Sequence, residues 1–389
     1  MALRPGPTAP PAAPARVRPA LAAGVILVLA AALFAPKVSR KMPDLEVYWK
    51  AAVRARAAEP LYRAEDHHYQ FKYLPAFAVL AVPGGALPLQ TAKAAWYVIS
   101  IALVVALLAL GPSLLPERRR PAWLLVTAAL VAMAKFLAHE VVLGQVNTLL
   151  AVLVVAAVLA MRRSKEAAAG LLIALAIVVK PYAVIFLPWL LARRRWTAAA
   201  AAGVSLGGLL ALPALVYGWA GNIALHQAWW RTVTTSTAPN LANADNVSIA
   251  GMFVKWLGPG ATAAALAMAV SGAVVAVAVV VVLQRRRVRF PEGLEAALLL
   301  TCIPLLSPQG WDYVFLVSMP AVVFLVNYAD RLPRALRWTA GAALAVIAFS
   351  LFDVMGRAAY GAFMALSIIT LCYLVVLAAL AALRARAVA

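Results

Sequence analysis

A carboxylate followed by aromatic residues is the first part of the chain whose residue types could support chemistry. Asp44 lies four positions before Tyr48 and five before Trp49. The apolar residues after Asp44 recur at the spacing of an amphipathic helix on a membrane surface: Leu45, Tyr48, Trp49, Ala52 and Val53. Asp44 would then either cap this helix or, beside an apolar wall at the water interface, accept a proton from a substrate hydroxyl. The spacing alone favours the cap and leaves the base open.

Residues that often bind metals or form disulfides are few. His67 and His68 follow Asp66, but adjacent histidines rarely converge on one ion, so we assign no metal site. Cys302 and Cys372 both lie in apolar runs and cannot define a disulfide framework or a zinc site, so we expect them to be packing residues. The chain has no Gly-rich phosphate loop and no DxD motif, and we assign no cofactor.

The composition excludes a soluble globular enzyme. Of the 389 residues, 65% are hydrophobic and 13% are charged, and the mean hydropathy is +0.89. Soluble domains have only about half of their residues apolar. At roughly 20 apolar residues per crossing, the chain has room for about ten to twelve transmembrane helices. The sequence therefore predicts an all-α, multi-pass integral membrane protein.

The net charge of +21 could indicate nucleic acid, anionic lipid or membrane topology. The distribution of the basic residues favours membrane topology, because a basic cluster follows each of several apolar runs, as in cytoplasmic loops. These clusters lie at 118–120, 162–165, 193–195, 285–289, 331–337 and 384–386. No nucleic-acid motif accompanies them, so we expect membrane lipids and no nucleic acid as partners.

These clusters predict an orientation for the whole chain. Residues 1–19, rich in Pro and Ala, are expected to form a disordered cytoplasmic tail, and residues 20–389 a single polytopic membrane domain. The run 20–35 is interpreted as an uncleaved anchor, and the Pro- and Gly-broken run 73–89 as an interfacial or re-entrant segment. The other expected spans are 94–115, 123–137, 147–161, 198–217, 261–283, 294–306, 314–328, 338–352 and 358–383.

One stretch, 167–192, lies between two basic clusters but is too short for a full hairpin, which would need roughly 40 residues. We interpret it as two shortened helices that break at Lys180 and Pro181, beside a cavity. A single tilted span is the alternative. With the short hairpin counted as two, the topology has about twelve crossings and two long outer loops, 37–93 and 218–260. Nine of the fourteen carboxylates then fall outside: Asp44, Glu46, Glu59, Glu65, Asp66, Glu140, Asp245, Asp312 and Asp353.

A series of short motifs follows in a fixed order from residue 44 to about 325: Asp44-x-x-Val47-Tyr48-Trp49-x-Ala51-Ala52, Pro60-Leu61-Tyr62, Phe71-x-Tyr73-x-Pro75, Pro88, Gly144-Gln145-x-Asn147, Lys180-Pro181, Arg194-Arg195-Trp196 and Ser307-Pro308-x-x-Trp311. This series resembles glycosyltransferase family 87, which contains mannosyltransferases of the GT-C class that use polyprenyl phosphate mannose. The resemblance implies a GT-C-type helical bundle and Asp44 as the catalytic base, so it reverses the preference for the cap. It also implies a second acidic residue near Glu140, beside His139, which would assist Asp44 or orient the acceptor. A solvated carboxylate at a helix end is the alternative for Glu140.

The resemblance further implies a polyprenyl phosphate sugar as donor and a lipid-linked or glycan acceptor. The donor phosphate needs cations near the membrane boundary. Lys180 is the first choice for this role, although it could merely snorkel; Lys72, Lys93 and Arg231 are further candidates. Where some relatives have a His pair after the tryptophan, this chain has Asp312 and Tyr313. The substrate-binding residues expected besides Lys180 and Lys72 are Tyr48, Trp49, Tyr73, Gln145, Asn147, Trp311, Asp312 and Tyr313.

The sequence thus predicts a glycosyltransferase in the cell membrane whose active site faces the extracytoplasmic side. It would transfer a hexose, with mannose the first expectation, by an inverting displacement. An arabinosyl or glucosyl transferase with the same kind of donor is one alternative. A transporter or lipid flippase is another, but such proteins usually have internal repeats, and we find no convincing repeat. A catalytically inactive scaffold is the third.

Overall fold

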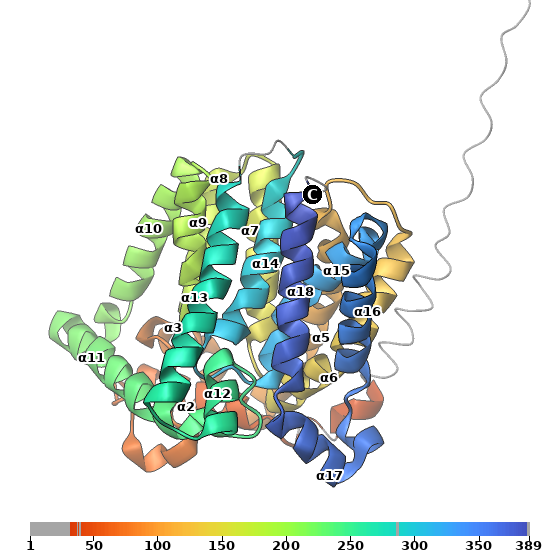
Figure 1. Ribbon diagram of the computed structural model, residues 1–389. Coiled ribbons are helices and arrows are strands. Elements are labelled where there is room, and N and C mark those ends of the chain that lie inside the picture. The colour runs from red at the N-terminus through yellow and green to blue at the C-terminus, as the bar shows by residue number, and fades with distance from the viewer. Residues whose placement is uncertain (1–31, 37, 39, 285–287, 387–389) are drawn as a thin grey trace, which may run out of the picture.

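The computed structural model describes residues 32–36, 38, 40–284 and 288–386, and within these ranges every regular element is a helix (Figure 1). The expected tail 1–19 lies outside the described residues, as does most of the expected anchor 20–35. The all-α prediction is confirmed for the described part. Its long helices run side by side, and shorter helices lie across one end of them.

Four helices are long and apolar enough to cross a membrane: α5 (Leu89–Leu110, continued by η2, Gly111–Leu114), α6 (Ala122–Leu143), α13 (Ala261–Leu283) and α18 (Ile368–Ala385). Two bent pairs raise the number to as many as six within the described residues. These pairs are α10 (Trp196–Ala211) with α11 (Ala214–Leu241), bent by 92°, and α16 (Arg334–Phe349) with α17 (Phe352–Ala365), bent by 108°. The expected count of twelve crossings is not confirmed.

Two expected spans are wrong in their bounds. The run 358–383 is divided between α17 and α18, because Ser367 stands between them with a left-handed φ of 54°. The run 198–217 is interrupted between α10 and α11, where Pro213 precedes the second helix. Both breaks lie within continuous apolar runs, so the hydropathy pattern did not reveal the turns.

The remaining apolar segments form shorter helices. They are α7 (Asn147–Arg162), α8 (Glu166–Val179), η3 (Pro181–Ile185), α9 (Phe186–Ala192), α14 (Pro291–Leu306), η4 (Asp312–Ser318), α15 (Met319–Asn327) and η5 (Ala329–Arg331). Helices α8 and α10 pack very closely, since a Cβ on Gly170 would lie 2.4 Å from the carbonyl oxygen of Ala198. Such close approach through small residues is how apolar helices associate without a hydrophobic driving force.

Residues 167–192 form the expected hairpin. Helix α8 ends at Val179, Lys180 is extended, and Pro181 begins the returning segment. The two ends meet again, because Arg195 lies 2.9 Å from the carboxylate of Glu166. A single tilted span would separate these two residues, so the hairpin prediction is confirmed and Lys180 stands at its apex.

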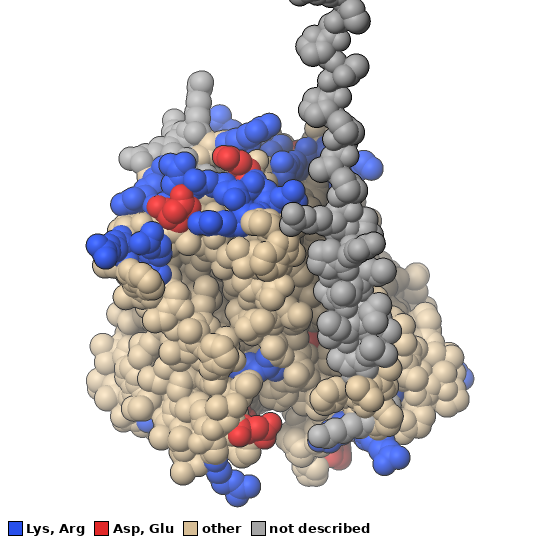
Figure 2. Space-filling model, turned by 90° about the vertical axis from the view of Figure 1, so that its right-hand side faces the viewer, with Lys and Arg blue, Asp and Glu red and all other residues tan. Residues whose placement is uncertain are grey.

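Basic side chains gather in a band at the hairpin's open end, the end at which the chain terminates (Figures 1 and 2). Ion pairs and hydrogen bonds join the clusters there. Arg119 pairs with Asp330, Arg195 with Glu292, and Arg193 with buried Glu295. Arg386 donates to the carbonyl oxygen of Arg331. The clusters expected on one side of the membrane therefore do share one end of the bundle; part of the cluster 285–289 lies outside the described residues.

The opposite end carries the two segments predicted as long outer loops. The first contains α2 (Pro43–Arg56), η1 (Ala64–Tyr69), α3 (Pro75–Leu80) and α4 (Val82–Gly85). The run 73–89 is thus short helices packed on α2, as its prolines and glycines predicted. The segment 218–260 is largely helical, because α11 continues to Leu241 and α12 (Ile249–Leu257) follows. The prediction that 218–260 forms a long loop is therefore wrong, because most of this segment is helical.

Candidate active site

The side chain of Gln145 joins four elements at the end of the bundle opposite the basic band. Its amide nitrogen donates to Asp44 Oδ2 at 2.8 Å, and its amide oxygen accepts hydrogen bonds from Tyr48 at 3.0 Å and Tyr73 at 3.2 Å. The phenol oxygen of Tyr313 lies 3.4 Å from the same nitrogen. Five of the residues expected at the site therefore meet around one buried amide.

A glycine turn brings Gln145 to this position. Helix α6 ends at Gly144, which has a φ of +72°, a conformation that other residues adopt only at a cost. A Cβ there would also lie 2.9 Å from Leu45 Cβ of α2. Gly144 thus lets the chain turn sharply and lets α2 pack against the turn, so that Asp44 and Gln145 can meet.

Asp44 is not the cap of α2. Met42 occupies the N-cap position, no side chain caps the helix, and Pro43 begins it. The Asp44 carboxylate is half-buried in the first turn and accepts a hydrogen bond from Gln145. Burial raises its pKa, an effect that the Gln145 hydrogen bond and the charges of Lys180, His139 and Lys72 partly offset. The cap interpretation is wrong, and the carboxylate is more basic than an exposed one.

Two tyrosines form a neutral wall beside Asp44. The phenol oxygens of Tyr48 and Tyr73 lie 2.6 Å apart, and their rings meet edge to face at 4.9 Å. Burial raises the pKa of both phenols, so both remain protonated at neutral pH. They can donate hydrogen bonds to a sugar hydroxyl without adding charge.

Lys180 reaches this wall from the hairpin apex. Its Nζ lies 4.8 Å from the centre of the Tyr73 ring, within the range of a cation–π contact. Lys72 is half-buried next to Tyr73; burial lowers its pKa, and the charge of Asp44 opposes that shift. The hairpin apex and the segment before α3 thus bring two cations toward one carboxylate.

Two cations considered for the donor phosphate lie elsewhere. Lys93 is buried and pairs with Glu46 at 2.5 Å, so its charge is already neutralised. Arg231 lies on α11 and lines hollows formed with residues such as His226, Trp230 and Tyr62. Neither contacts Asp44 or Gln145. Position in the sequence could not separate these cations from Lys180.

Glu140 is buried and forms hydrogen bonds to the start of α7. Its Oε2 accepts from the Asn147 amide at 2.8 Å, and its Oε1 from the Thr148 backbone N–H at 2.9 Å. Glu140 thereby ties the end of α6 to the first turn of α7, on either side of Gln145. The residue is 2% exposed, so the solvated-carboxylate interpretation is wrong. Its contacts, and those of Asn147, suit positioning of the loop better than contact with an acceptor.

His139 lies at the site, although the sequence pattern indicated no separate role for it. Its Nδ1 lies 3.3 Å from Asp312 Oδ1, and its ring meets Tyr313 edge to face at 5.0 Å. The His139 side chain is 41% exposed while that of Asp312 is 9% exposed. A polar pair on α6 and η4 therefore borders the Gln145 network. The pairing was invisible in the sequence because 173 positions separate the two residues.

The two tryptophans expected at the site have other contacts. The Trp49 indole donates to the Leu87 carbonyl oxygen at 2.9 Å, which fixes α2 to the end of the α4 segment. Trp311 forms an isolated antiparallel bridge with Asn246, and Val247 N–H donates to the Gly310 carbonyl at 2.7 Å. Trp49 is thus structural. Trp311 belongs to a loop held by the segment before α12, directly ahead of Asp312.

Within the described residues, no group of three or more His, Cys, Asp or Glu side chains is arranged to hold a metal ion. The His68 ring instead contacts that of Tyr69 in a tilted arrangement, at 3.8 Å between centroids. Cys302 and Cys372 are buried free thiols. The side chains that meet at the site are a carboxylate, phenols, an imidazole and ammonium groups.

The family model of glycosyltransferase family 87 matches residues 71–308, well over half of the chain. The chain belongs to this family. No curated protein matches it. The matched region contains Tyr73, Gln145 and Lys180, and the structure brings Asp44, which precedes it, into hydrogen-bond contact with Gln145. The protein is a membrane glycosyltransferase, as family membership and its apolar helices together indicate.

Proposed function

We propose that this family 87 enzyme transfers a hexose, with mannose as the first expectation, from a polyprenyl phosphate sugar to a lipid-linked or glycan acceptor. One observation carries the proposal. A half-buried carboxylate, Asp44, lies in a network with neutral hydroxyl donors and within the electrostatic range of Lys180, whose ammonium group contacts the Tyr73 ring. A base, hydrogen-bond donors and a phosphate partner are the groups that such a transfer requires.

The reaction is a single displacement. Asp44 accepts the proton of an acceptor hydroxyl as its oxygen attacks the anomeric carbon of the sugar. The bond from that carbon to the phosphate oxygen breaks, and its electron pair leaves with the polyprenyl phosphate. The configuration inverts because attack and departure occur on opposite faces. The raised pKa of Asp44 makes it a better proton acceptor than an exposed aspartate.

Lys180 would bind the leaving phosphate. As the bond to the sugar breaks, negative charge grows on the phosphate, and a fixed ammonium group stabilises that charge. Lys180 stands at a helix break on the hairpin apex and rests on the Tyr73 ring, so its position is set before the donor arrives. Lys72 is the second cation near enough to Asp44 to act on its charge.

The surrounding residues would position these groups. Gln145 holds the Asp44 carboxylate, and Glu140 with Asn147 holds the turn that carries Gln145. His139, oriented by Asp312, would contact a hydroxyl of the sugar or the acceptor from the more exposed side. Tyr313 joins the two groups, since its ring packs on His139 and its phenol lies near Gln145.

We further propose that this end of the bundle faces the extracytoplasmic side of the cell membrane. The basic band at the opposite end supports this orientation under the positive-inside rule. An enzyme working outside has no nucleotide sugar within reach, which favours a lipid-carried donor.

A panel of radiolabelled polyprenyl phosphate sugars tests the proposal on the purified full-length protein in lipid. We expect transfer from the mannose donor; transfer from an arabinose or glucose donor instead would change the sugar and keep the mechanism. Asp44→Asn should lower the transfer rate at least about a hundredfold, while Asp353→Asn, at an exposed aspartate of α17, serves as the matched control. No transfer from any lipid-phosphate sugar by a folded wild-type protein would overturn the donor class.

A further inference from the structure

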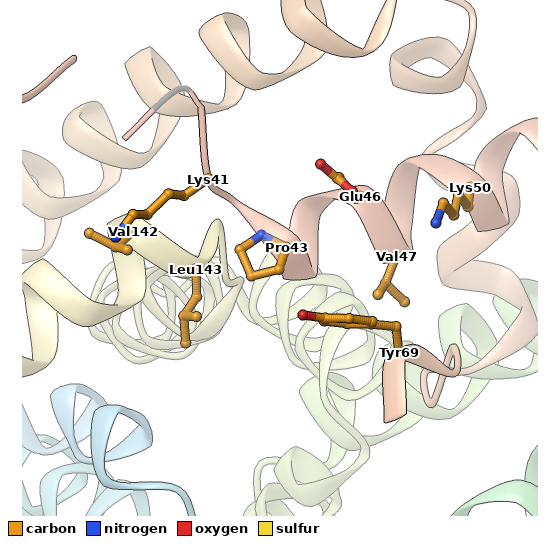
Figure 3. A pocket seen from close by; sticks show the side chains of 8 residues that line it. All are labelled: Lys41, Pro43, Glu46, Val47, Lys50, Tyr69, Val142 and Leu143. Carbon is orange, nitrogen blue, oxygen red and sulfur yellow. The ribbon is translucent and has the colours of Figure 1, made fainter. Parts of the chain in front are cut away.

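A separate hollow of about 490 Å³ lies beside the first two turns of α2 and the end of α6 (Figure 3). None of its lining residues belongs to the Gln145 network. They are Lys41, Pro43, Glu46, Val47, Lys50, Tyr69, Val142 and Leu143. The hollow thus adjoins α2 and α6, which also border the active site, and Tyr69 of η1 completes its lining.

The charges around this hollow favour an anion. Lys41 and Lys50 are exposed and flank it from its two ends in Figure 3, and neither forms an ion pair with another described residue. Glu46, the acidic residue of the lining, is already paired with buried Lys93 at 2.5 Å. Within the described residues, Lys41 and Lys50 are therefore the lining cations that form no ion pair, although the charge of Lys50 also acts on Asp66, which is itself paired with Arg54.

The rest of the lining is apolar, which a small hydrated anion does not require. Pro43, Val47, Val142 and Leu143 form one side, and the Tyr69 ring, 45% exposed, lies across from Val47. A tyrosine with an apolar body and a polar tip suits the boundary between headgroups and hydrocarbon. Cations above apolar side chains match a molecule with a charged head and a hydrocarbon tail.

We propose that this hollow binds the phosphate-bearing head group of an anionic membrane lipid. The hollow adjoins the active site, since Pro43 lines it and is the direct neighbour of Asp44, and Leu143 precedes Gln145 by two residues.

Chemical footprinting measures occupancy at each lysine separately. The full-length protein in neutral detergent is acetylated with and without dioctanoyl phosphatidylglycerol, dioctanoyl phosphatidylcholine or inorganic phosphate, and modification is followed by mass spectrometry. We expect the anionic lipid to slow acetylation of Lys41 and Lys50 at least threefold, and the other two probes to have little effect. Lys165, exposed in the basic band, is the internal control.

Each other pattern of protection overturns a stated part of the proposal. Equal protection of Lys165 would show general attraction of anionic lipid to a basic protein. Equal protection by phosphatidylcholine would remove the need for charge, and equal protection by inorganic phosphate would remove the need for a lipid. Unchanged acetylation of Lys41 and Lys50 would mean that the hollow binds none of them.

Variants test whether Lys41 and Lys50 bind the lipid, and whether this binding is independent of catalysis at Asp44. Lys41→Gln with Lys50→Gln should weaken binding of the anionic lipid at least fivefold, measured by quenching of a bimane label at Val142→Cys. The two native cysteines are buried and should not react. Arg163→Gln with Lys165→Gln removes the same charge at the other end and should leave the signal unchanged. Asp44→Asn should retain lipid binding; its loss of transfer alone concerns the proposed function, and unchanged binding in the lysine variant would overturn the site.

Discussion

The amide nitrogen of Gln145 lies 2.8 Å from the carboxylate of Asp44, and this contact joins α2 to the turn between α6 and α7. The same amide accepts from both tyrosines of the neutral wall. A neutral donor stabilises the Asp44 carboxylate without supplying a cation that would strongly lower its basicity. The site can therefore keep a half-buried carboxylate both ionised and able to accept a proton.

Asp44→Asn tests this role directly. The change preserves size and removes the basic oxygen, so the transfer rate should fall by roughly 10² to 10⁴, the usual contribution of a positioned general base. Donor binding should be largely unchanged. Transfer and folding are measured on one purified preparation, so that misfolding is not mistaken for lost chemistry. A rate above about a tenth of wild type would be smaller than the loss expected of a general base and would shift attention to Asp312.

The stability of the protein should also respond to Asp44. Burial raises the pKa of this carboxyl in the folded state, so the folded protein binds its proton more tightly than the unfolded chain does. The resulting cost is fully present above the folded-state pKa and disappears as the pH falls below the unfolded pKa. At neutral pH, Asp44→Asn should therefore raise the melting temperature in detergent while activity falls. The exposed Asp353→Asn should leave both unchanged.

The transfer rate should depend on pH through the same group. Because only ionised Asp44 accepts a proton, activity should rise as the pH increases through its pKa and should fall below it. Because burial raises the pKa of Asp44, this acidic limb of the pH–rate profile should lie at a higher pH than an exposed aspartate would produce. A rate measured across the acidic range with saturating substrates would detect it. A limb that persists unchanged in the residual activity of Asp44→Asn would belong to another group.

Lys180 should act on the donor. Lys180→Ala should raise the apparent KM for the lipid-phosphate sugar about tenfold or more, because a hydrogen bond to a charged group contributes roughly 1.5 to 3 kcal/mol. Lys180→Arg keeps the charge and should lose less. Lys165→Ala, an exposed lysine of the basic band, is the matched control. Unchanged donor kinetics in a well-folded Lys180→Ala protein would show that this lysine does not bind the donor phosphate.

Local patterns predicted much of this arrangement, and long-range pairing did not. The spacing after Asp44 predicted α2, and the charge of the flanking clusters predicted the hairpin at Lys180, because helical period and basic residues act locally. The bends at Pro213 and Ser367 were hidden inside continuous apolar runs. Lys93 pairs with Glu46 and is therefore not available to a donor phosphate. The sequence could not show this, because 47 positions separate the two residues.

The His139 and Asp312 pair provides a last prediction, which separates a substrate contact from a structural one. Asp312 is buried and holds Nδ1 of an imidazole whose side chain is 41% exposed, so Asp312 should act through His139 while His139 meets the substrate. His139→Ala should lower kcat/KM about tenfold, a loss of about 1.4 kcal/mol in transition-state stabilisation. Asp312→Asn should cause a similar loss, and the double variant should be little worse than either single one, because residues acting as one unit are not additive. His139→Asn, which can still donate from a similar position, should recover part of the activity. Fully additive losses, or a fall in melting temperature that accounts for the lost activity, would show that the two side chains only pack together.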